Sequence, residues 1–163
     1  MMALLILGLI LWVGAHYFRR FMPEQRAAMG RRGKGIIAVA IVAALVMIII
    51  GYRGAAFIPV WTPPPFLTHL NNLLMVLAFW VYGSSAAKGA KAWPAYKPRH
   101  PQLMAVKIWA VAHLLVNGDL ASILLFGTML AWAVGSVILI NRAEPNWTPP
   151  APAGKATYIR LAV

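Results

Sequence analysis

The chain has 163 residues, of which 61% are hydrophobic and only 11% are charged. Soluble domains average about 45–50% apolar and about 25% charged residues, so this composition argues against a water-soluble globule, a disordered chain or a nucleic-acid-binding domain and leaves a small integral membrane protein. The net charge of +12 is assigned to membrane topology and anionic lipid headgroups, because the basic residues lie between the apolar segments. Cysteine is absent, so a metal or cofactor would have to be held by His, Asp, Met or Tyr.

Five apolar segments are long enough, or nearly so, to cross the roughly 30 Å hydrocarbon core as helices of about 20 residues. They are residues 1–18, 36–52, 66–83, 101–118 and 120–140. The sequence therefore predicts an all-α, polytopic membrane helix bundle of about five transmembrane helices in residues 1–142. The remainder, residues 143–163, is expected to be a Pro-rich cytoplasmic tail, in which EPNWTPPAPAGK at residues 144–155 is polyproline-like and largely disordered. The first segment has no basic stretch before its apolar run, so we expect a retained helix rather than a cleaved signal peptide.

Lysine and arginine are distributed unevenly among the connecting segments, and this distribution predicts the orientation. Two connections are rich in basic residues: the first holds Arg19, Arg20, Arg26, Arg31, Arg32 and Lys34, and the third holds Lys88, Lys91, Lys97 and Arg99. The second connection holds only Arg53, and the turn at 117–119 holds none. The tail holds Arg142, Lys155 and Arg160. Cytoplasmic loops are enriched in Lys and Arg. We therefore expect the N-terminus outside the cytoplasm and the C-terminus inside it.

Four histidines are candidates for function, because ionisable groups in membrane helices are costly and tend to mark functional sites. His113 lies well inside the fourth predicted helix, either as a hydrogen-bonded interior residue or as an axial ligand to haem or another metal. His16 lies near the inner end of the first helix, and His69 lies near the outer start of the third. His100 precedes Pro101 at the cytoplasmic boundary, where an interfacial role is expected.

Depth restricts which histidines could share one iron. With a rise of about 1.5 Å per residue, His113 lies about 15 Å from the inner edge of the membrane, His16 about 6 Å and His69 about 25 Å. His16 and His69 are then about 20 Å apart in depth, which is too far for one iron. His113 is the common member of any bis-histidine site, and on this geometry its partner stays open between His16 and His69.

Other polar residues gather at the outer side: Asn71, Asn72, Asn117 and Asp119. Asp119 directly precedes the fifth predicted helix, so we expect its carboxylate to cap the free N–H groups there. The functional alternative is a polar mouth for proton uptake above His113. The chain has no Walker loop, no GxSxG, no HExxH and no paired carboxylates, and no catalytic residue is predicted.

The segment RHPQLMAVKIWAVAHLLVNGDLASILLFGTMLAWAV at residues 99–134, with GLILWVGAHYF in the first helix, closely resembles the NnrU family of bacterial membrane proteins. The resemblance covers nearly the whole chain. It implies a multi-pass protein of the bacterial inner membrane that acts as an accessory factor in nitrogen-oxide metabolism during denitrification. The family is related to 15-cis-zeta-carotene isomerase, a membrane enzyme that contains haem b.

That relationship implies site residues. His113 matches one haem ligand of the isomerase, His16 matches the other, and His100 matches the histidine of its RHP motif. The isomerase also has a cysteine, implicated as an alternative ligand, three positions before its helical histidine. Here that position is Ala110, so the resemblance does not extend to ligand-switch chemistry.

Three functions of different classes follow. The first is a haem-binding accessory or redox protein of nitrogen-oxide metabolism, the second is a carotenoid cis–trans isomerase, and the third is a cofactor-free structural or interaction subunit. The absence of cysteine argues against the second, and the histidines within helices argue against the third. Whether the chain is an enzyme, and which protein partners it has, do not follow from its residues.

Overall fold

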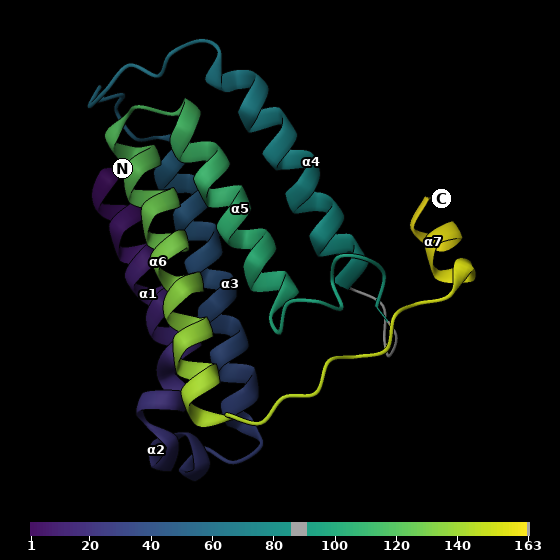
Figure 1. Ribbon diagram of the computed structural model, residues 1–163. Helices are drawn as coiled ribbons and strands as arrows, with labels where there is room; N and C mark the ends of the chain where they lie inside the picture. Colours follow the sequence, from purple (N-terminus) through teal and green to yellow (C-terminus); the bar gives the residue numbers. More distant parts are fainter. Residues whose placement is uncertain (86–90, 163) are drawn as a thin grey trace. The chain divides into compact units, whose positions relative to one another are not determined.

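The computed structural model describes residues 1–85 and 91–162, and every regular element in those ranges is an α-helix (Figure 1). The helices are α1 (Met2–Phe21), α2 (Pro23–Ala28), α3 (Arg32–Arg53), α4 (Leu67–Ser85), α5 (Pro101–Val116), α6 (Leu120–Ala143) and α7 (Lys155–Ala162). The all-α class is therefore confirmed. Lys88, one of the basic residues used to predict orientation, lies outside the described residues.

Three of the described helices, α1, α3 and α6, are long and apolar enough to cross a membrane. Helix α5 is apolar but has only 16 residues, and at about 1.5 Å per residue it is about 24 Å long. Helix α4 has 19 residues and carries His69, Asn71 and Asn72 in its first two turns. The chain thus has the helices of a membrane protein, while the count of five spans and their orientation stay predictions.

Two segments outside the long helices, α2 and the C-terminal tail, differ from expectation. Helix α2 was not expected; it begins with Pro23, whose fixed φ and missing N–H suit the first helical position. Residues 144–155 of the tail were expected to be largely disordered, and that is wrong in part. Their main chain pairs with Lys91, through Lys91 N to Ala151 O at 3.0 Å and Ala153 N to Lys91 O at 2.8 Å, and α7 follows. Main-chain pairing of this kind leaves no pattern in the side chains.

The chain divides into two compact units, and the first contains residues 1–62 and 118–128. In it α1 and α3 form a closely packed antiparallel hairpin (Figure 1). A Cβ atom added to Gly51 would lie 2.4 Å from the Leu5 nitrogen, and one added to Gly8 would lie 2.9 Å from the Ile48 nitrogen. Small residues let membrane helices approach this closely. The two glycines therefore bring the two backbones together.

The turn before α6 belongs to the same unit and is tied to the segment that follows α3. Val60 N donates to Gly118 O at 2.8 Å, and Leu120 N donates to Ile58 O at 2.9 Å. Pro59 and Asp119 form an isolated antiparallel bridge between these hydrogen bonds. The turn thereby fixes where α6 begins.

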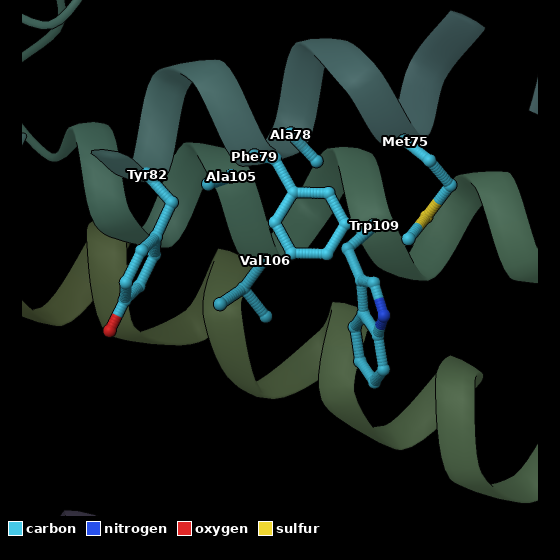
Figure 2. Close-up of a pocket in the computed structure, with 7 residues that line it drawn as sticks. All are labelled: Met75, Ala78, Phe79, Tyr82, Ala105, Val106 and Trp109. Atoms are coloured by element: carbon cyan, nitrogen blue, oxygen red, sulfur yellow. The ribbon is translucent and has the colours of Figure 1, made fainter. Parts of the chain in front are cut away.

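The second unit contains residues 63–117 and those from 129 onward, so α6 continues from the first unit into the second. Its centre is the pair α4 and α5, which pack against each other. Ala78 on α4 and Ala105, Ala110 and Ala112 on α5 are buried. In Figure 2, Met75 and Trp109 lie towards one end of this pair and Tyr82 and Ala105 towards the other, so the two helices run antiparallel.

Candidate functional site: two tryptophan–histidine pairs

Helices α1 and α5 carry the same five-residue motif, W-x-x-A-H. It reads Trp12 to His16 in α1 and Trp109 to His113 in α5. Residues four apart lie on one face of a helix, so each indole meets the imidazole one turn later. The ring centroids are 4.4 Å apart in the Trp12–His16 pair and 5.3 Å apart in the Trp109–His113 pair. The tryptophans were not predicted as site residues, although the repeated motif could have revealed them.

The His16 imidazole is held by its own helix. Its Nδ1–H donates to the main-chain oxygen of Trp12 at 2.8 Å. In a neutral ring this hydrogen bond leaves the lone pair on Nε2. Histidines that bind metals usually donate the other ring N–H to a carbonyl or carboxylate in this way. His16 is therefore in the tautomer that ligation through Nε2 requires.

The His113 imidazole has the opposite arrangement. The amide nitrogen of Asn117 lies 3.3 Å from His113 Nδ1 and donates to the His113 main-chain oxygen at 2.8 Å. When Nδ1 accepts a hydrogen bond, the neutral ring carries its proton on Nε2. Ligation through Nε2 would require the other tautomer and an acceptor for Nδ1–H. The Asn117 oxygen could serve after rotation of the amide group, with loss of the bond to the main chain.

The position of His113 in its helix corrects an expectation. We expected it well inside the fourth helix, but α5 ends at Val116 and His113 lies in its last turn. Asn117 leaves the helical conformation, with φ −115° and ψ 112°. His113 lies about 18 Å along the helix from Pro101, near the end that meets the 117–119 turn.

His69, the alternative partner, lies on the exposed face of α4. Two residues later, Asn71 is half-buried, and about 200° of helical rotation separates the two side chains. By helical spacing, Asn71 lies one turn before Met75 and two turns before buried Ala78 on the same face of α4, and His113 lies one turn after Trp109. Asn71, unlike His69, therefore lies on the face of α4 that packs against α5, at the end of the helix pair where His113 lies.

His100 connects the start of α5 to the end of α6. Its Nε2–H donates to the side-chain oxygen of Asn141 at 2.9 Å. The neighbouring Arg99 donates to the main-chain oxygen of Glu144 and forms an ion pair with its carboxylate at 3.9 Å. These contacts give His100 a structural role between the start of α5 and the end of α6.

The Asp119 carboxylate caps α6, as the sequence predicts. Its oxygens accept from Ser122 N at 3.0 Å and from Ser122 Oγ at 2.5 Å. Because Ser122 gives its hydroxyl proton to Asp119, Tyr52 is the donor in the 2.9 Å contact between the two hydroxyl groups. These contacts of Asp119 serve the start of the helix rather than a path for protons.

An apolar cavity of about 220 Å³ lies between α4 and α5 (Figure 2). It is lined by Met75, Ala78, Phe79, Tyr82, Ala105, Val106 and Trp109. Pockets for drug-sized ligands usually measure about 300–1,000 Å³, so this cavity could hold only part of a macrocycle. In residues 1–85 and 91–162, no group of three or more His, Asp or Glu side chains could hold a metal ion.

Comparison with known proteins gives one result. A family model described as NnrU protein matches residues 4–163, nearly the whole chain. Among curated proteins and among solved structures, no significant match is found.

Proposed function

The chain belongs to the NnrU family, and from this premise we propose that it is a multi-pass protein of the bacterial inner membrane that binds haem b and assists nitrogen-oxide metabolism. The observation that best supports haem binding is the hydrogen bond from His16 Nδ1 to the Trp12 carbonyl oxygen. This hydrogen bond gives His16 the tautomer that a metal-ligating histidine needs. His16 lies in a helix that is long and apolar enough to cross a membrane.

We propose His113 and His16 as the two axial ligands. Both are half-buried and both lie beside an indole ring four residues earlier. Neutral imidazole is a common axial ligand of haem iron, and bound haem would supply a one-electron redox couple. The chain's own contribution at His16 is then the orientation of its imidazole by the Trp12 carbonyl group; at His113 the Asn117 amide would have to rotate so that its oxygen accepts from Nδ1–H.

The spectrum of the purified protein tests this function. Protein prepared in mild detergent from cells supplied with a haem precursor should show a Soret band and haem b by the pyridine haemochrome method. Apoprotein should also take up added haemin and develop the same band. Well-folded protein that contains no haem and takes up none would contradict the proposal and favour the cofactor-free interpretation.

A second candidate, carotenoid cis–trans isomerisation, is supported by the apolar cavity between α4 and α5, one turn from His113. Ala110 stands where the related isomerase has its cysteine, which weighs against it. Membranes from cells that make a cis-carotene should show no isomerisation above the background of an empty vector. Isomerisation that depends on His113 would favour this second candidate.

We further propose that α4 and α5 also lie in the membrane, which makes five spans with the N-terminus outside. The uneven distribution of Lys and Arg over the connecting segments supports this orientation. An enzyme reporter that is active only outside the cytoplasm should be active when fused after Gly54 and silent when fused after Ala90, which lies outside the described residues. The reverse pattern would contradict the orientation.

A further inference from the structure

An apolar groove of about 480 Å³ runs along the α1–α3 hairpin of the first unit. Its wall extends from Ile10 past Gly14 to Phe18 on α1 and includes Ile36 and Ala40 on α3. A Cβ atom added to Gly14 would meet no atom within 4 Å. The two backbones approach closely at Gly8 and Gly51, and the groove lies along the part of the hairpin nearer the connection between the helices.

The groove ends at the most basic segment of the chain. Phe18, Met29 and Ile36 line that end, and residues 19–34 between them contain six basic side chains and one acidic side chain, Glu24. Arg26 is half-buried, and the other five basic residues are exposed. In the part of the chain that the structure describes, none of the six forms an ion pair.

One of these basic groups is held at the mouth of the groove. Arg26 Nη1 donates to Gly30 O at 3.3 Å, and a Cβ atom on Gly33 would lie only 2.6 Å from the same nitrogen. The guanidinium group therefore lies against the backbone beside Met29, which lines the groove. Guanidinium groups bind phosphate oxygens through two parallel hydrogen bonds.

Two basic residues of the second unit have acceptors that include a carboxylate or a helix-end carbonyl of the chain. Lys91 Nζ donates to Ser85 O at 2.7 Å, and Arg99 is engaged by the main chain and carboxylate of Glu144. There the chain itself provides the acceptors. In residues 19–34 six basic side chains face only one acidic side chain in the sequence, so we expect them to attract an anion from outside the chain.

We propose that this face binds an anionic diacyl phospholipid of the bilayer, with one acyl chain in the groove and the phosphate against Arg26 and its basic neighbours. The apolar wall suits methylene groups, which gain free energy when they are buried. Polybasic segments beside membrane helices attract anionic headgroups. This lipid site is independent of haem binding.

Binding is tested on the full-length protein in detergent by native mass spectrometry, with phosphatidylglycerol and phosphatidylcholine of identical acyl chains. We expect phosphatidylglycerol to be retained about tenfold more strongly, and R31Q/R32Q to remove most of that preference, because each basic residue contributes to attraction of anionic lipid. K155Q removes an exposed charge in the tail and should leave the preference unchanged. Equal retention of the two lipids would overturn the proposal.

The groove is tested by Gly14→Leu, which fills it where the structure has open space. Gly127→Leu is the matched control, because a Cβ there also meets no atom within 4 Å. Gly14→Leu should release the bound lipid while thermal unfolding shows that the protein stays folded, and Gly127→Leu should retain it. A preference for phosphatidylglycerol that survives Gly14→Leu would show headgroup attraction without a seated chain and would overturn the site.

Discussion

The Trp12–His16 and Trp109–His113 pairs share one motif but present their imidazoles differently. In α1 the helix continues past His16, and His16 donates from Nδ1 to its own helix. In α5 the helix ends three residues after His113, and Asn117 donates to Nδ1 while it satisfies a terminal carbonyl group. The place where the helix ends, rather than the motif, therefore sets which nitrogen of the ring carries the proton.

The helices that carry the two motifs also pack differently. Helix α1 meets α3 through glycines whose missing side chains allow the backbones to touch. Helix α5 meets α4 through alanines and leaves an apolar cavity beside Trp109. The first pair is therefore expected to tolerate less change at its contact than the second.

The largest expected effect is at that glycine contact. Gly51→Ala should destabilise the α1–α3 hairpin by about 3 kcal/mol, at the upper end for overpacking, because its Cβ would meet the Leu5 backbone, which cannot rotate away. Gly83→Ala in α4 is the control, since a Cβ there meets nothing within 4 Å. Thermal unfolding in detergent measures both. Equal melting temperatures for the two variants would contradict the difference in packing.

Replacing Asn117 should give His113 the same tautomer as His16, with the proton on Nδ1. Asn117→Asp offers His113 Nδ1–H an acceptor, which favours ligation through Nε2. If haem is bound, we expect its transfer to apomyoglobin to slow about tenfold, the lower end of effects seen at groups that orient metal ligands. The exposed Asn72→Asp is the charge-matched control. Faster loss of haem from Asn117→Asp than from the control would show that Asn117 does not govern the His113 ligand.

A smaller effect is expected at the α6 cap. Asp119→Leu should cost about 1 kcal/mol or somewhat more, because the Ser122 N–H and hydroxyl groups lose their acceptor. Asp119→Asn keeps a capping oxygen and should retain most of the stability. Chemical denaturation in mixed micelles compares the two. If Asp119→Asn folds fully yet fails to support function in cells, the charge of the carboxylate matters beyond the cap.

The sequence predicted those features of the fold that depend on neighbouring residues rather than on contacts between distant segments. Runs of apolar residues located the five long helices to within a few residues, and Asp119 before an apolar run identified the α6 cap. The tail pairing with Lys91 was missed, because it uses only main-chain groups. The close approach at Gly8 and Gly51 was missed as well, because a glycine in an apolar run does not reveal which backbone it faces.

The candidate site was predictable in part for similar reasons. All four histidines were identified as candidates from their rarity in apolar segments. The face of α4 that carries His69 could not be read, because apolar residues lie all round that helix and give no buried side. The role of Asn117 depended on where α5 ends, and hydropathy locates helix ends only loosely.

The haem content of four variants purified in the same way tests the two proposed histidine ligands. Removal of an axial ligand should lower haem affinity or change the spin state of the iron. His113→Leu and His16→Ala should therefore lose the Soret band or shift it, while His69→Ala, on the exposed face of α4, and His100→Ala, bonded to Asn141, should keep it. A spectrum that survives His113→Leu but disappears with His100→Ala would contradict the assignment.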